Sequence, residues 1–291
     1  MKRALRLAGQ GAAAITLCLL GGAPLAGQRI LGGTPSSEHP AVGALLDAGG
    51  NLVCSGFLVG PSCVLTSAHC VDSGQLTGGR FLLGPDIDLP YQFLINVRAV
   101  QDHPSWDPNT LAHDIAVVAL ESAANIPALP LGSPGVVGSA IRLVGFGLAE
   151  GSNIGERRKV DTVIAALSSQ QIQWSGTSSN VCDGDSGGPT LRLVSGTWQA
   201  VGVASFADGS CNQFGGSWRT DADLNSFVLP AVALCTATQV GNGLFLDGFE
   251  SETTERWSAA VPTLLHCAAG AANGGDGDGA AASASSICPA E

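Results

Sequence analysis

The most informative segment of this 291-residue chain is Cys182-Asp183-Gly184-Asp185-Ser186-Gly187-Gly188-Pro189. Glycines on both sides of Ser186 allow the backbone to curl tightly, so that two N–H groups can converge. We assign these donors to Gly184 and Ser186, because a serine nucleophile needs N–H groups aimed at the oxyanion that its attack creates. Pro189 and the run Thr190–Val194 come next, so the segment leads into a β-strand.

Two upstream segments carry the other groups that a serine nucleophile needs. They are Leu65-Thr66-Ser67-Ala68-His69-Cys70 and His113-Asp114-Ile115-Ala116. A serine hydroxyl reacts at neutral pH only when an imidazole takes its proton and a carboxylate orients that imidazole. The nucleophile elbow of α/β-hydrolases also reads Gly-x-Ser-x-Gly, but there the acid and the histidine follow the serine, and the turn enters a helix. The order His69, Asp114, Ser186 excludes that alternative.

The region from Ile30 to about Val228 reads as short β segments separated by Gly-Gly, Gly-Pro, Asp-Pro and Ser-Gly dipeptides. With only 13% charged residues and 40 glycines, the composition favours an all-β protein. One helix is expected, from Ser226 to Cys235, with Ser226 as its cap. The expected strands include Ala41–Leu46, Val53–Val59, Cys63–Ser67, Phe93–Val100, Ile115–Leu120, Ile141–Gly145, Lys159–Leu167, Thr190–Val194 and Thr197–Phe206.

These segments, in this order and with 45 positions between His69 and Asp114, resemble the trypsin/chymotrypsin type of serine endopeptidase. The resemblance covers roughly residues 30–234. It implies an all-β fold of two six-stranded antiparallel β-barrels, with the active site in the cleft between them and a C-terminal helix. It also implies that His69 is the general base and then the acid, that Asp114 orients it, and that Ser186 is acylated. Gly145-Phe146-Gly147 resembles a Gly-Trp-Gly turn of the family, and Val203–Ala207 resembles its substrate-pairing strand.

Cysteine usage favours disulfides in an exported chain. Cys18 lies in the leader described below, which leaves eight cysteines. The family resemblance pairs Cys54 with Cys70 and Cys182 with Cys211. For the other four, three pairings are open. Our hypothesis joins Cys63 to Cys235 and Cys267 to Cys288, because the C-terminal helix of this fold packs on the first barrel.

The same resemblance suggests how the protein is activated. Arg29-Ile30-Leu31-Gly32-Gly33 is similar to the family's activation site, with cleavage after Arg29 and the new Ile30 ammonium paired with Asp185. The alternative is that Arg29 only flanks the leader.

The expected specificity pocket departs from the trypsin pattern. Asn180 stands where trypsin-like members carry an aspartate, and Ser205, Ala207 and Gly216 are expected in the pocket, with Ser205 also touching Asp114. An amide carries no charge, so we expect a medium-sized uncharged side chain before the cleaved bond. Another protease must then cleave after Arg29.

The chain divides into four parts in this interpretation. Residues 1–26 are a signal peptide, 27–29 a short propeptide, 30–240 the protease domain, and 241–291 a C-terminal low-complexity appendage. A membrane anchor is the alternative for the first part. The last part loosely resembles segments appended to exported bacterial proteins, and its role as linker, surface-retention signal or processed propeptide stays open.

Net charge and composition limit the kinds of partner that the protein can bind. The net charge of −11 counts against nucleic acid and anionic membranes. We expect a secreted monomer that is extracellular, periplasmic or on the cell surface and has no membrane contact after the signal is removed. Its expected partners are polypeptide substrates and protein inhibitors. No cofactor or metal is expected. His39 and His103 are expected to be surface or loop residues. The alternative function is a catalytically inactive binding protein on the same fold.

Overall fold

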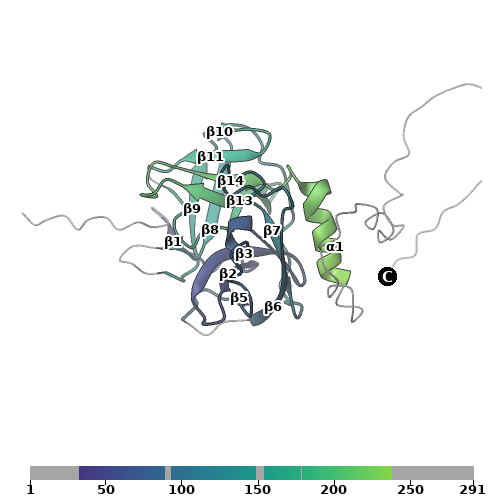
Figure 1. The fold of residues 1–291 in the computed structure, drawn as a ribbon. Coiled ribbons are helices and arrows are strands. Elements are labelled where there is room, and N and C mark those ends of the chain that lie inside the picture. Colours follow the sequence, from purple (N-terminus) through teal and green to yellow (C-terminus); the bar gives the residue numbers. More distant parts are fainter. Residues whose placement is uncertain (1–32, 89–92, 149–153, 178, 238–291) are drawn as a thin grey trace, which may run out of the picture. The chain divides into compact units, whose positions relative to one another are not determined.

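The computed structural model describes residues 33–88, 93–148, 154–177 and 179–237, which form two antiparallel β-sheets followed by a C-terminal helix (Figure 1). Arg29, Ile30, Cys267, Cys288 and the expected appendage lie outside these residues. Within the described ranges, no helix has both the length and the apolar character needed to cross a membrane.

The first sheet is a closed barrel in the order β2-β3-β4-β7-β6-β5. Irregularities in register, for example between Leu58 and Gly60, add the bends that closure requires. Every residue of β2 and β7 is buried, in keeping with their continuous apolar sequences. The strands are β2 (Val42–Leu46), β3 (Leu52–Gly60), β4 (Cys63–Thr66), β5 (Arg80–Leu83), β6 (Phe93–Asp102) and β7 (Ala116–Leu120).

The second sheet has eight strands in the order β1-β9-β8-β12-β13-β14-β11-β10. They are β1 (Thr34–Pro35), β8 (Ala140–Gly145), β9 (Arg158–Val163), β10 (Ala166–Leu167), β11 (Gln171–Ser175), β12 (Pro189–Val194), β13 (Thr197–Ala207) and β14 (Phe214–Arg219).

The sequence predicts a second closed, six-stranded barrel here, and the structure confirms an antiparallel sheet whose strand order is not recorded as closed. The expected strand Lys159–Leu167 is interrupted at Ile164 and Ala165, so its first part pairs with β8 and its second part with β11. The N–H of Ile164 bonds to Ser139 on one side, and that of Ala165 bonds to Gln173 on the other. One bent stretch of chain therefore connects both sides of the sheet without pairing β9 to β10.

The C-terminal helix also starts later than expected. A π-helical turn, η3 (Leu224–Val228), precedes α1 (Leu229–Ala237), so Ser226 lies inside the turn and does not cap a helix. Asp223 occupies the capping position, where its carbonyl accepts hydrogen bonds from the N–H groups of Phe227 and Val228. Figure 1 shows α1 next to β7, and the Cys63–Cys235 disulfide attaches this helix to β4 of the first barrel.

A continuous apolar core connects the two sheets. It contains Phe57 and Leu65 from the first barrel and Leu191 and Val203 from the second sheet, together with Phe227 of the turn before α1. The segments that carry His69, Asp114 and Ser186 leave the sheets along this shared core, so packing holds them in a fixed relation.

Candidate active site

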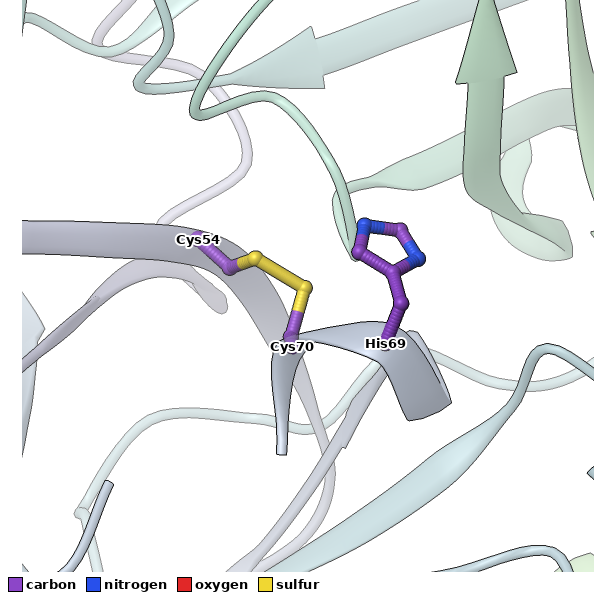
Figure 2. A group of neighbouring side chains, drawn as sticks. All are labelled: Cys54, His69 and Cys70. Atoms are coloured by element: carbon purple, nitrogen blue, oxygen red, sulfur yellow. A yellow bond between two sulfur atoms is a disulfide. The ribbon is translucent and has the colours of Figure 1, made fainter. Parts of the chain in front are cut away.

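His69 lies in a single 3-10 turn, η1 (Ala68–Cys70), directly after β4. The disulfide between Cys54 of β3 and Cys70 holds this turn against the barrel (Figure 2). Because Ala68 and Cys70 are buried, the turn is anchored on both sides of the histidine, whose side chain is 30% exposed. Both neighbouring sulfur atoms are bonded to each other, so neither is a thiolate that could join His69 as a metal ligand.

Asp114 is fully buried and orients the imidazole of His69. Its Oδ2 lies 2.8 Å from His69 Nδ1, and its Oδ1 accepts the backbone N–H of His69 at 3.0 Å. The hydroxyl of Ser205 donates to Oδ2 at 2.5 Å. A carboxylate can only accept, so Nδ1 carries the proton and Nε2 of the neutral ring is left as a base.

Ser186 lies in the turn between Cys182 and β12, and the first barrel and β13 hold that turn. The Ser186 carbonyl accepts the N–H of Ser55 at 2.8 Å. One carbonyl, that of Ala204 in β13, accepts both the N–H of Gly187 at 2.8 Å and the hydroxyl of Ser67 at 2.6 Å. The loops that carry Ser186 and His69 are thus bound to the same atom. No hydrogen bond joins the Ser186 hydroxyl to His69 within the described part of the chain.

The backbone of this turn leaves two donors free. Gly184 has a φ of +89°, and a β-carbon there would crowd Leu52 and Gly147, so the position needs glycine. The carbonyl of Asp183 accepts the N–H of Leu148 at 2.8 Å, which fixes the peptide that carries the Gly184 N–H. Among the hydrogen bonds of the described residues, the N–H groups of Gly184 and Ser186 have no acceptor.

Asp185 is fully buried beside the nucleophile candidate. Its oxygens accept the N–H groups of Gly147 at 2.8 Å and of Cys182 at 2.9 Å. Burial raises the pKa of this carboxyl from 3.8 to about 7, because the two N–H donors offset only part of the lost hydration. None of the described residues places a cation in contact with the carboxylate, and the expected partner Ile30 lies outside them.

A cavity of about 290 Å³ opens beside Ser186. Ser205 and Ala207, both expected in the pocket, line it. Other lining residues are Val181, Cys182, Asp183, Phe206 and Asp208, and the Cys182–Cys211 disulfide connects two of its sides. Four donors bind the Asp208 carboxylate, and the Ser210 hydroxyl contributes most to holding its pKa well below the usual range.

Asn180 and Gly216 are not among the residues that line this cavity. Asn180 is fully buried; its Oδ1 accepts the Trp174 indole N–H at 2.9 Å and its amide donates to the Phe214 carbonyl at 3.0 Å. Gly216 lies against the ring of Phe206, whereas a β-carbon on Gly215 would overlap Asn180. The bulge in β13 between Ala204 and Phe206 sets this register, which cannot be inferred from residue spacing.

Sequence reasoning missed a second cluster of polar side chains, which includes His113, the residue before Asp114. The indole of Trp218 and Nδ1 of His113 contact one oxygen of Asp223, at 2.7 and 3.0 Å, and the ring of His103 stacks on His113. His103 and His39 lie in loops, which is one of the two settings expected for them, but both are buried. His103 Nδ1 accepts the N–H of Ser105, so its proton is on Nε2, which faces Asp223. Both ring nitrogens of His103 are thus engaged in polar contacts within the protein, so this cluster is a hydrogen-bonded network rather than a preformed metal site.

Known proteins resemble most of the chain. A protein-family model described as Trypsin matches residues 30–228. Vitamin K-dependent protein C of Rattus norvegicus is 28% identical over 220 residues, which cover 63% of this chain and 47% of that protein. Trypsin beta of Drosophila erecta is 26% identical over 242 residues, covering 73% and 94%. Chymotrypsin-like elastase family member 1 of Bos taurus is 30% identical over 224 residues, covering 65% and 83%. The chain spans about half the length of the first relative and most of the other two.

Proposed function

Because this chain belongs to the trypsin family of serine proteases, we propose that it is an active serine endopeptidase that hydrolyses polypeptides through an acyl-enzyme intermediate. The observation that carries the proposal is the arrangement of His69 on Asp114. A buried carboxylate holds Nδ1–H and leaves Nε2 as a base, on a loop that shares the Ala204 carbonyl with the Ser186 turn.

The proposed reaction starts with proton transfer from the Ser186 hydroxyl to His69 Nε2 as the oxygen attacks the peptide carbonyl. The N–H groups of Gly184 and Ser186 stabilise the oxyanion, and they are suited to this because no described residue occupies them. His69 then protonates the leaving amine. Water, activated by the same imidazole, releases the acyl group. Two N–H groups and the Ser205 hydroxyl donate to Asp114 and hold it in place throughout.

We infer that cleavage after Arg29 activates the protein. The Ile30 ammonium would then pair with Asp185, whose raised pKa shows that its buried site favours the neutral acid until a cation arrives. Pairing of β1 with β9 and a hydrogen bond from Arg158 to the Gly33 carbonyl, at 2.7 Å, hold the chain just beyond the cleavage point. Ile30 lies three positions before Gly33, so the new terminus reaches at most about 10 Å from this anchor.

We further propose that the residue before the cleaved bond is uncharged and of medium size. All of the polar side-chain atoms of Asn180 are bonded to Trp174, Val181 and Phe214, so none is available to a substrate cation. Val181 and Ala207 give the cavity apolar walls. Asp208 is half-buried, and four hydrogen-bond donors already occupy its carboxylate. Cleavage after Arg29 then requires another protease.

The remaining parts of the proposal concern the protein's setting. Three disulfides in the described residues suit an oxidising compartment, which supports secretion after removal of residues 1–26, with residues 27–29 as a propeptide. The proposed catalytic domain is 30–240, acting as a monomer on polypeptides and open to protein inhibitors. The appendage 241–291 lies outside the described residues, and its role is not assigned.

The test is covalent labelling of Ser186 by a fluorophosphonate. Protein cleaved after Arg29 should be labelled and should hydrolyse peptides, whereas the Ser186→Ala variant should do neither. Uncleaved protein serves as the second control and should react far more slowly. A folded, cleaved protein that stays unlabelled would instead support the inactive binding protein. Peptide-library profiling of the active form then measures the residue preferred before the cleaved bond.

A further inference from the structure

Ser55 of β3 connects the first barrel to the turn that carries the oxyanion donors. It is fully buried and makes four hydrogen bonds. Its hydroxyl donates to the Gly184 carbonyl at 2.8 Å and accepts the N–H of Phe146 at 2.9 Å. Its own N–H donates to the Ser186 carbonyl at 2.8 Å, and its carbonyl accepts the Thr66 hydroxyl at 2.9 Å. All of its polar atoms are therefore satisfied.

These bonds fix the turn at the carbonyls on either side of Asp185. Because N–H and C=O point in opposite directions across a trans peptide, holding a carbonyl also aims the N–H of the same peptide. Leu148 holds the Asp183 carbonyl, whose peptide carries the Gly184 N–H, and Ser55 holds the next carbonyl along the chain. The two peptides that flank the Gly184 α-carbon, Asp183–Gly184 and Gly184–Asp185, are thereby both held. Gly184, with its φ of +89°, has no side chain to restrain it otherwise.

The hydroxyl of Ser55 also connects two separate loops. Phe146 belongs to the Gly145-Phe146-Gly147 segment after β8, and Gly147 donates to Asp185. Removing the hydroxyl would leave the buried Phe146 N–H and the part-buried Gly184 carbonyl without partners, which is unfavourable. Rotation of the Gly184–Asp185 peptide toward another donor would relieve this cost. The peptide that carries the Gly184 N–H would then be held on one side only, and its donor would no longer be kept aimed at the substrate.

The geometry points to Ser55 as a positioning residue for the oxyanion site, one that holds the Gly184–Asp185 peptide from the first barrel and so supports the adjoining peptide that carries the Gly184 donor. This inference rests on the proposed function. Ser55 touches no reacting atom, so its effect passes through the Gly184 N–H. Its loss should therefore weaken binding of the transition state and leave binding of the ground state unchanged.

The test compares Ser55→Ala with the unmodified protein, both cleaved after Arg29. We expect kcat on a peptide amide to fall about 10- to 100-fold, less than the ~10²–10³-fold loss when an oxyanion donor is removed outright. KM should stay the same. The inhibition constant of a peptide aldehyde, which forms a tetrahedral adduct with the serine, should rise by the same factor as kcat falls.

The matched control is Thr220→Val. Thr220 is fully buried, and its hydroxyl donates to the Ala200 carbonyl at 3.0 Å, away from the Ser186 turn. This variant should lose stability but keep its kcat and its aldehyde affinity. If Ser55→Ala changes kcat, KM and aldehyde affinity no more than the control does, the positioning role is refuted while the proposed function stands. An unmodified protein without activity would overturn both.

A second measurement covers the case in which Ser55→Ala does not fold. In the unmodified protein, the amide proton of Phe146 should exchange with solvent as slowly as the strand amide of Val144, because it is bonded to a buried hydroxyl. Exchange as fast as that of an exposed loop amide would overturn the inference.

Discussion

The uncleaved protein should become less stable as the pH rises, because of Asp185. Its pKa is about 7 in the fold against an ordinary value of 3.8. Between these values the folded state keeps a proton that the unfolded chain has lost, so the free energy of unfolding falls with rising pH. A shift of one pKa unit is worth about 1.36 kcal/mol, which gives about 4 kcal/mol in total. About 2 kcal/mol of this is lost between pH 5 and 7, because the folded carboxyl is already half ionised at pH 7.

The comparison is with Asp185→Asn, which carries no titrating group at this position. Both proteins would also carry Ser186→Ala, so that neither digests itself. Urea unfolding followed by tryptophan fluorescence at pH 5, 6, 7 and 8 gives each free energy of unfolding. An asparagine has one acceptor oxygen for two N–H donors, which costs a constant amount and does not change the slope. Only the difference between the two slopes tests the argument.

Other groups do not disturb this difference. Burial lowers the pKa of His39 to about 4, so the unfolded chain binds a proton at this histidine more tightly than the folded protein does. The contribution of this residue to the free energy of unfolding therefore increases with rising pH between about pH 4 and 6.5. It is present in both proteins and cancels. After cleavage at Arg29, pairing with the Ile30 ammonium should remove the loss of stability above pH 5. Equal slopes for the two uncleaved proteins would refute the reasoning.

Three further predictions concern single contacts. Ser205→Ala removes a hydroxyl bonded to the Asp114 carboxylate, so kcat/KM should fall about 10- to 100-fold with little change in folding, as steady-state kinetics and circular dichroism would measure. Asn180→Asp should not create cleavage after Arg or Lys and should lower the melting temperature, because the carboxylate would face the Phe214 carbonyl; peptide-library profiling and calorimetry check this. Replacing both Cys63 and Cys235 by alanine opens a link between residues 172 positions apart and should destabilise the protein by about 5 kcal/mol in chain-entropy terms, read from urea unfolding in the Ser186→Ala background.

The candidate catalytic residues could be predicted because each lies in a recognisable local motif. The order of these motifs along the chain then excludes the α/β-hydrolase alternative. The glycines around Ser186 indicate a tight turn that can supply oxyanion donors, and the Ala-His-Cys segment indicates where the base His69 lies. Most strand positions were also readable from apolar runs. The structure describes β5, β11 and β14 as well, which the sequence did not single out; β14 contains two glycines that weaken its strand signal.

What escaped prediction depends on contacts between distant parts of the chain. A bulge shifts β13 against β14 beside the pocket, and Asn180 is not among the residues that line it. Asp223 and His113 form a hydrogen bond although they are 110 positions apart in the sequence, and Ser55 and Gly184 do so at a separation of 129 positions. Side chains such as Ser55 look ordinary in sequence because their importance comes only from what the fold places opposite them.

The Cys63–Cys235 disulfide determines what happens when another protease cuts this protein. It joins β4 of the first barrel to α1, so every peptide bond between residues 63 and 235 lies inside one covalent loop. A cut in the connection between the two sheets would leave both pieces attached. A nicked molecule would stay whole until a reductant reaches this buried bond, so damage to its surface loops would accumulate without releasing fragments.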